Sequence, residues 1–365
     1  MVSGEESMTR ARRHGEVLSA VERAADALDL FGRASAGLRR LMPFDAAVWT
    51  ATDPETGLVT APMLVENMGA GEGCAAYWES ELLEENVVPF RDLARAAVPV
   101  AGLRAATGDL PARSARFRRL LGGQGVDDEL RAVLRAGDRP WGVVSLFRMR
   151  GRTAFGPDEV ALLATLSGPL AGRLRRFARP SGAEPEPGAS APGLLLFDEH
   201  GEATSINEEA RRYLALLPDG PAMPSALGLR LPIWLIGTAL QARAIARGRD
   251  RGSAQVRIRT RDGRWLTCRA SCLTGAGGRP GPVALVIEPA AAADLAVIVA
   301  QAYGLTPREF EIARLVARGL PTGEIAAALV ISPHTVRGHL KAVFGKTGIS
   351  SRGELVARLF AEHHR

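Results

Sequence analysis

The chain contains few cysteines and few aromatic residues. Its 365 residues include three cysteines, Cys74, Cys268 and Cys272, and aromatic side chains make up 5% of the composition. Three scattered cysteines exclude a disulfide framework and a zinc site of paired-cysteine spacing. Cys268 and Cys272 lie four apart in a predicted strand, about 13 Å at roughly 3.3 Å per residue, which is beyond disulfide reach. We therefore expect them to pack in a core and expect a reducing compartment.

Long apolar segments are also missing. Stretches such as 194–197 and 232–240 are far shorter than the roughly 20 residues needed to span a bilayer. The first 15 residues are polar and carry three arginines with no apolar segment behind them, unlike a signal peptide. We therefore expect a cytoplasmic protein without a membrane partner.

Recognisable catalytic and metal-binding patterns are absent as well. The sequence has no nucleophile elbow, no paired carboxylates in a catalytic setting and no metal-ligand cluster, and its acidic residues are interpreted as surface. The Gly-rich stretch 122–125 lacks the lysine of a phosphate-binding loop and is predicted to be a turn. His334 and His339 are five apart on a predicted helix, which does not match the spacing of paired metal ligands. We expect no enzyme activity, no cofactor and no metal.

The composition is otherwise that of a globular protein of two or three domains. Hydrophobic residues make up 46% and charged residues 24% of the chain. Forty-six Lys and Arg against 40 Asp and Glu give a formal charge of +6, which favours polyanionic partners.

The segment 15–178 is predicted to be an α+β domain with an antiparallel sheet. Apolar residues at helical spacing from Val17 to Phe31 predict one helix that ends near Pro43. Two hairpins follow, 44–51 with 58–65 and 131–135 with 141–149; a helical insert over 74–121 separates them, and the helix 157–177 comes last. This element order, with stretches such as FDAAVWTATDPETG and WGVVSLFR, resembles a GAF-type sensory domain.

A second sensory domain is predicted after a linker. Residues 179–192 are rich in Pro, Gly, Ala and Ser without apolar periodicity, as in an exposed linker. Residues 193–290 then show a short hairpin, two helices and three strands, an order that resembles a PAS-like domain. Residues 291–303 are predicted to be a connecting helix.

Residues 304–365 are predicted to form four helices. Thr306-Pro307-Arg308-Glu309 is a capping box with proline at the first helical position, and Gly319 ends that helix. Thr322 is predicted to cap the second helix and Ser332 the third, while Ser351 with Glu354 opens the fourth. About three residues separate the second and third helices, the turn length of a helix-turn-helix.

The third of these helices is predicted to enter the major groove of DNA, because its basic residues lie opposite its apolar stripe. Arg337 and Lys341 are one turn apart and project together; an arginine fork fits the O6 and N7 acceptors of guanine. Gly338 is also on the outward face, but it has no side chain that could contact a base edge. Residues predicted to contact phosphates are Thr306, His334, Thr335, His339, Lys346 and Arg352, with side chains suited to fixing register.

This last segment resembles the LuxR-type DNA-binding domain. It carries the family's LTxRE opening, GLxxxEIA second helix, ISPHTVxxHLxxVFxK third helix and SRxEL ending. The resemblance implies base reading at Arg337, Gly338 and Lys341, and a dimer contact through the last helix. Gly323, Gly338 and Gly345 depart from the family pattern, which often has larger or basic side chains there.

Together these features predict a multidomain α+β transcriptional regulator that binds double-stranded DNA as a homodimer. Its front domains would sense a small molecule, bound in the GAF-like domain, or a partner protein. Two alternatives stay open: an interaction protein with incidental DNA affinity, and an enzyme with a DNA-binding tail.

Overall fold

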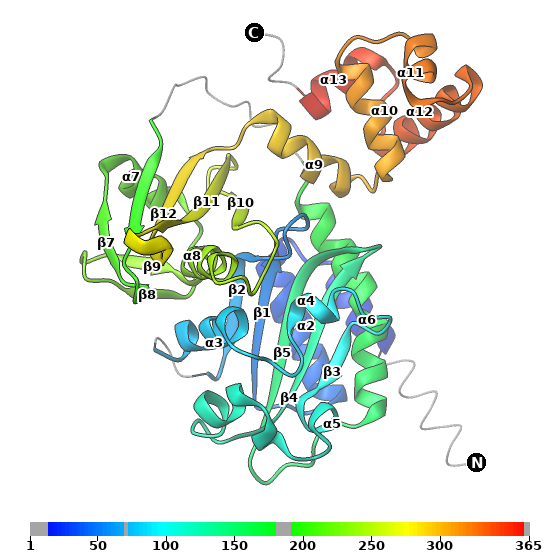
Figure 1. Cartoon of the computed structure of the whole chain (residues 1–365). Coiled ribbons are helices and arrows are strands. Elements are labelled where there is room, and N and C mark those ends of the chain that lie inside the picture. Colours follow the sequence, from blue (N-terminus) through cyan, green and yellow to red (C-terminus); the bar gives the residue numbers. More distant parts are fainter. Residues whose placement is uncertain (1–13, 69–71, 180–190, 361–365) are drawn as a thin grey trace, which may run out of the picture. The chain divides into compact units, whose positions relative to one another are not determined.

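The computed structural model describes residues 14–68, 72–179 and 191–360. It divides into two compact units: residues 1–174 with 187–288, called the N-terminal unit below, and residues 175–186 with 289–365, called the helical unit. The N-terminal unit holds two five-stranded sheets built from antiparallel pairs, and the helical unit is all α (Figure 1). The expected α+β class with a helical C-terminal domain is therefore confirmed.

The first sheet has the strand order β2-β1-β5-β4-β3. Both predicted hairpins are present, with β4 beginning at Val126 rather than Arg131. Its strands are β1 (Ala46–Thr52), β2 (Val59–Glu66), β3 (Val100–Gly102), β4 (Val126–Ala136) and β5 (Arg139–Met149). The α-helices around it are α2 (Ala27–Leu41), α3 (Glu72–Leu83), α4 (Phe90–Leu93), α5 (Leu103–Thr107) and α6 (Pro157–Phe177).

Two expectations for this region were wrong. The single helix from Val17 to Pro43 is interrupted near Ala24, because the Asp26 carboxylate accepts the Asp29 N–H and so caps the start of α2. The insert 74–121 is not wholly helical, since it contains β3, which pairs with β4. A strand of three residues leaves too little alternation to recognise.

The second sheet has the order β10-β11-β12-β6-β7. When strands are numbered within each sheet, both sheets read 2-1-5-4-3. Its strands are β6 (Gly193–Phe197), β7 (Ala203–Ile206), β10 (Gln255–Arg259), β11 (Trp265–Thr274) and β12 (Pro280–Pro289). Between β7 and β10 lie α7 (Glu208–Leu216), α8 (Ile233–Ala246) and a small hairpin of β8 (Ala222–Pro224) and β9 (Arg230–Pro232), which the sequence analysis missed. Most of the predicted linker, 180–190, lies outside the described residues.

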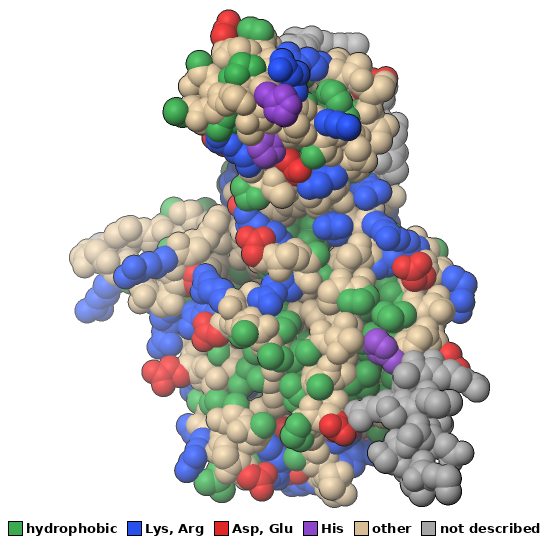
Figure 2. Space-filling view, turned by 90° about the vertical axis from the view of Figure 1, so that its right-hand side faces the viewer, with side chains coloured by type: hydrophobic (Ala, Val, Ile, Leu, Met, Phe, Trp, Pro, Cys, Tyr) green, Lys and Arg blue, Asp and Glu red, His purple; other side chains and the backbone are tan. Residues whose placement is uncertain are grey.

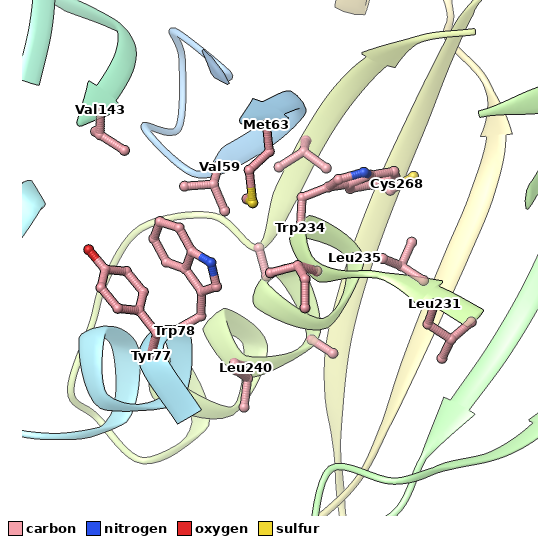
Figure 3. Close-up of a cluster of buried hydrophobic side chains, with 14 of the residues drawn as sticks. Val59, Met63, Tyr77, Trp78, Val143, Leu231, Trp234, Leu235, Leu240 and Cys268 are labelled. Carbon is pink, nitrogen blue, oxygen red and sulfur yellow. The ribbon is translucent and has the colours of Figure 1, made fainter. Parts of the chain in front are cut away.

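One apolar cluster continues from the first sheet to the second within the N-terminal unit. Helix α3 packs against α8, and Figure 3 shows Trp78 of α3 beside Val59 of β2, with Leu240 of α8 nearby. Cys268 is fully buried in this cluster, where burial raises the pKa of its thiol, and both Cys268 and Cys272 are free. The packing role predicted for Cys268 is therefore confirmed, whereas the side chain of Cys74 lies outside the described residues.

The expectation that the acidic residues are surface residues was also wrong for several of them. Glu81 and Glu129 are buried beside Arg116 and Arg131, with Arg131 Nη2 2.6 Å from Glu81 and Arg116 Nη2 2.9 Å from Glu129. Each arginine also lies over an aromatic ring, within 4 Å of its centroid. We call these four residues the buried ion cluster; it lies between α3 and β4.

A second buried ion pair joins β10 to the turn after β1. Arg257 Nη1 lies 3.0 Å from both carboxylate oxygens of Asp53, and the Arg257 backbone N–H donates to the same group. The Asp53 carboxylate also accepts the N–H of Glu55, which forms the turn expected there. In addition, Thr56 Oγ1 donates to the Gln255 carbonyl. The two sheets of the N-terminal unit are thus linked by polar contacts as well as by the apolar cluster.

The helical unit consists of α9 (Ala292–Ala302), α10 (Pro307–Ala317), α11 (Thr322–Leu329), α12 (Pro333–Thr347) and α13 (Arg352–Phe360). Its own apolar core includes Ile312, Ile325, Val336, Val343 and Leu355. Across the described residues of both units, no helix is long and apolar enough to cross a membrane.

Candidate nucleic-acid interface

Helix α10 begins with the capping box that the sequence predicts. Thr306 Oγ1 accepts the Glu309 N–H at 3.2 Å, and the Glu309 carboxylate accepts the Thr306 N–H at 2.7 Å. Arg308 extends from the first turn and donates from Nη2 to the Leu329 carbonyl at the end of α11. These contacts fix α10 against the helix-turn-helix.

The turn between α11 and α12 has the expected length of three residues, Val330 to Ser332. Val330 adopts a left-handed conformation with φ of +54° and is 90% exposed. This conformation is strained for a β-branched residue, and the N–H groups of Val330 and Ile331 donate to the carbonyls of Ala327 and Ala326 at the end of α11. Ser332 then caps α12, accepting the Thr335 N–H at 3.0 Å.

Helix α12 has one buried face and one exposed face. Val336, Leu340 and Val343 are buried as predicted, while Phe344 is half-buried. The opposite face exposes His334, Thr335, Arg337, Gly338 and Lys341, and His339 is half-buried at its border. Neither Arg337 nor Lys341 has a hydrogen bond or ion pair with the part of the chain that the structure describes. Both cations are therefore available for a partner.

Lys346 is placed differently from the other predicted contacts. Its Nζ lies 2.6 Å from Glu309 Oε2, so it joins the last turn of α12 to the capping box of α10. Burial raises the pKa of the Glu309 carboxyl, but the hydrogen bonds from Lys346 and from Thr306 outweigh this effect and the pKa lies below its ordinary value. Part of the charge of Lys346 is thus already balanced within the protein.

Thr322 does not cap α11, which corrects the sequence prediction. The N-cap position belongs to Pro321, and Thr322 is the first helical residue. Its Oγ1 instead accepts a hydrogen bond of 3.1 Å from Arg352 Nη2, at the start of α13. Ser351 caps α13 as expected, accepting the Glu354 N–H. One N–H of Arg352 is used in this way, out of the five that a guanidinium carries.

The segment from Gly304 to Phe360 carries eight Lys and Arg against four Glu, a net charge of +4. Two of the four glutamates, Glu309 and Glu311, form ion pairs within the unit. Figure 2 shows Lys, Arg and His side chains exposed on the helical unit, in the upper part of the view. This charge balance suits a polyanionic partner.

Four glycines lie on exposed helical positions in this unit: Gly323, Gly338, Gly345 and Gly353. A Cβ at any of them would meet nothing within 4 Å, so the fold does not require glycine there. At Gly338 the open space lies on the exposed face of α12, between Arg337 and Lys341 in sequence. The absence of a side chain there is consistent with close approach of a ligand to the backbone.

Replacing Gly338 with alanine is expected to stabilise α12 by about 0.5–1 kcal/mol, since alanine has the higher helix propensity and no clash results. Native-state hydrogen exchange of the α12 amides in the whole chain measures this change. Gly348→Ala is the matched control: Gly348 ends α12 with φ of +69°, so this change should lower protection. Equal effects of the two substitutions would contradict the account.

Sequence reasoning missed the contacts that fix this unit internally. Lys346 and Glu309 are 37 positions apart, and Arg308 reaches Leu329 across 21 positions. The capping pattern identifies Glu309 as a cap but contains no signal for a distant lysine.

Comparison with known proteins agrees with this geometry. Residues 304–359 match the family model described as "Bacterial regulatory proteins, luxR family". An HTH-type transcriptional regulator of Mycobacterium bovis is 48% identical over 52 residues, and the regulatory protein UhpA of Escherichia coli is 43% identical over 56 residues. The C-terminal domain is thus a LuxR-type helix-turn-helix. The matched stretch spans only 6% of the mycobacterial protein and 29% of UhpA, so the similarity concerns this domain alone.

Solved structures give weaker similarities. The GAF domain of an Acinetobacter phosphoenolpyruvate-protein phosphotransferase matches 46% of this chain and 92% of its own, with 13% identity and a TM-score of 0.32. SdiA of Escherichia coli matches 94% of both chains, with 12% identity and a TM-score of 0.36. At these scores, neither similarity supports a conclusion on function.

Proposed function

We propose that the chain is a sequence-specific transcriptional regulator that binds double-stranded DNA through α12, with DNA binding controlled by a signal received in the N-terminal unit. The exposed face of α12 carries the proposal. Arg337 and Lys341 lie one turn apart on that face, and neither is paired within the described residues. A second helix at this position after a three-residue turn is the element that enters the major groove in helix-turn-helix proteins.

The residues on and around α12 would have different roles. Arg337 and Lys341 would contact base edges, with the DNA approaching the backbone at Gly338. Thr306, His334, Thr335, His339, Lys346 and Arg352 would contact phosphates and fix the register. Because Lys346 already pairs with Glu309 and Arg352 with Thr322, we expect these two to contribute less than the unpaired cations.

The remaining features of the proposal concern assembly and control. A homodimer formed through α13 would present two copies of α12 to half-sites about one helical turn apart. The N-terminal unit would sense a ligand or partner protein, as the separate compactness of this unit allows. The protein would act in the cytoplasm, as a regulator rather than an enzyme.

Replacing Arg337 with alanine is expected to weaken binding to the preferred DNA site by about 1–3 kcal/mol while leaving binding to random duplex nearly unchanged. The reason is that a guanidinium on a guanine edge contributes to specificity, whereas non-specific binding depends on total charge. Fluorescence anisotropy titrations on both duplexes at one salt concentration measure the two affinities.

Arg314→Ala is the matched control for this experiment. Arg314 is an exposed arginine on α10, in the same unit but off the α12 face, and its removal changes the net charge equally. It should weaken both duplexes by a similar, small factor. If Arg337→Ala lowers both affinities equally, base reading by Arg337 is excluded and the interaction-protein alternative is favoured.

A further inference from the structure

A pocket of about 710 Å³ lies inside the N-terminal unit. Its walls come from the turn between β1 and β2, from α3 and α4, from the hairpin of β4 and β5, and from α8 with the loop that follows it. Small-molecule sites in proteins typically measure about 300–1,000 Å³. The volume is therefore sufficient for an organic ligand of ordinary size.

Part of the pocket wall is apolar and aromatic. Figure 3 shows three of its residues, Val59, Trp78 and Val143, which come from β2, α3 and β5. Phe90 and Val133 also line this part. All five are buried, so a ligand in contact with them would meet a surface suited to an apolar body.

The charged residues of the pocket are not balanced. All four acidic side chains have cationic partners: Arg139 lies 3.5 Å from Glu55 and 3.8 Å from Asp138, Arg91 lies 3.5 Å from Asp250, and Glu81 belongs to the buried ion cluster. Three further arginines, Arg95, Arg249 and Arg251, line the pocket and form no side-chain ion pair with the described residues. The uncompensated charge of the pocket is therefore positive.

One polar side chain in the wall lacks a partner. Gln241 on α8 lines the pocket and is only 4% exposed, yet its amide forms no hydrogen bond with the described part of the chain. The amide nitrogen and oxygen of Gln241 are not sealed from solvent, so they face the open space of the pocket. An amide that donates and accepts inside a pocket is available to a ligand.

The space between α3 and β4 of the first sheet is a less suitable place for a ligand, because protein side chains occupy it. The space between α3 and β4 is filled by the buried ion cluster and by Tyr77, whose hydroxyl lies 2.7 Å from Ser145 Oγ. A ligand bound there would have to displace two arginines and two glutamates. The pocket beside α8 needs no such displacement.

We propose that this pocket binds an organic anion, with its apolar body against Trp78 and Phe90 and its anionic group held by Arg249, Arg251 and Gln241. Arg95 adds to the positive field. The binding itself is independent of the proposed DNA-binding function, but its regulatory meaning rests on it: the anion would be the signal that the N-terminal unit receives. Carboxylate, sulfonate and phosphate groups share the chemistry that an arginine fork recognises.

The test compares two fluorescent probes of nearly equal shape. 8-Anilinonaphthalene-1-sulfonate carries a sulfonate, and N-phenyl-1-naphthylamine has the same aromatic body without it. Titrated with the whole chain at physiological salt, the sulfonate probe should bind at least about tenfold more tightly than the neutral one. Equal affinities, or no saturable binding of the sulfonate below about 1 mM, would overturn the proposal.

Paired substitutions locate the binding. Arg249→Gln with Arg251→Gln should weaken the sulfonate probe by about tenfold or more and leave the neutral probe unchanged. The control, Arg211→Gln with Arg247→Gln, removes two exposed arginines that do not line the pocket and should change neither probe. If the control variant weakens binding of the sulfonate probe as much as the pocket variant does, the affinity depends on net charge alone. The probe then does not bind at Arg249 and Arg251, and the proposal is refuted.

DNA binding by the same preparations separates this inference from the proposed function. Sequence-specific DNA binding without anion binding would refute the pocket and leave the regulator intact. Anion binding that the pocket variant weakens, without sequence-specific DNA binding, would support the pocket and refute the proposed regulator.

Discussion

Replacing Asp53 with alanine is expected to destabilise the N-terminal unit by about 3–5 kcal/mol. The substitution leaves Arg257, whose side chain is 7% exposed, without its carboxylate, and an unpaired buried charge is much more costly than the pair was favourable. It also removes the acceptor of the Glu55 and Arg257 backbone N–H groups. Urea unfolding followed by tryptophan fluorescence measures the change in unfolding free energy. The signal reports on the N-terminal unit, because all five tryptophans of the chain, from Trp49 to Trp265, belong to it.

Two further variants make this prediction specific. Asp219→Ala removes an acidic residue whose partner Arg261 is 54% exposed, and it should cost less than about 1 kcal/mol. The double variant Asp53→Ala with Arg257→Met should be less destabilised than the sum of the single changes, since neither charge is then left buried alone. Additive effects would show that the two side chains do not interact.

Replacing Glu129 with alanine should likewise cost about 3–5 kcal/mol, because it leaves Arg116 and Arg131 facing Glu81 alone. Arg116 and Arg131 are 1% and 2% exposed, so water cannot take the place of the lost carboxylate. The same fluorescence-detected unfolding in urea measures the loss.

Arg119→Ala serves as the comparison for the buried ion cluster. Arg119 pairs with Glu84 but is 71% exposed, and the change should stay below about 1 kcal/mol. A small effect of Glu129→Ala, similar to that of Arg119→Ala, would contradict this prediction, because it would mean that water reaches the buried ion cluster.

The helical unit could be predicted from sequence to an unusual extent because its signals are local. A capping box spans four residues, and Ser332-Pro333 places a cap beside a proline at the start of a helix, so Thr306 and Ser332 are assigned correctly without tertiary information. Even here the local rule fails at Thr322, where Pro321 takes the N-cap position and the threonine hydroxyl accepts from Arg352.

In the N-terminal unit, the buried charges and the pocket could not be predicted from the sequence. Asp53 and Arg257 are 204 positions apart, and in a sequence each looks like an ordinary surface charge. Glu81, 50 positions from Arg131, gives no sign of burial either. The pocket beside α8 depends on the packing of α3 against α8, which no periodicity within either helix specifies. A charged side chain is buried when an oppositely charged partner, distant in the sequence, lies beside it in the fold. The residues next to it in the sequence therefore do not indicate its burial.

The most direct test of DNA reading by α12 is selection of bound sequences from a random duplex pool with the whole chain, followed by titration of the selected site against scrambled DNA at physiological salt. We expect convergence on one two-fold symmetric site, bound about a thousandfold or more tightly than scrambled DNA, with the preference reduced in Arg337→Ala. Enrichment of no sequence, with affinity that depends on salt alone both with and without a bound anion, would contradict it.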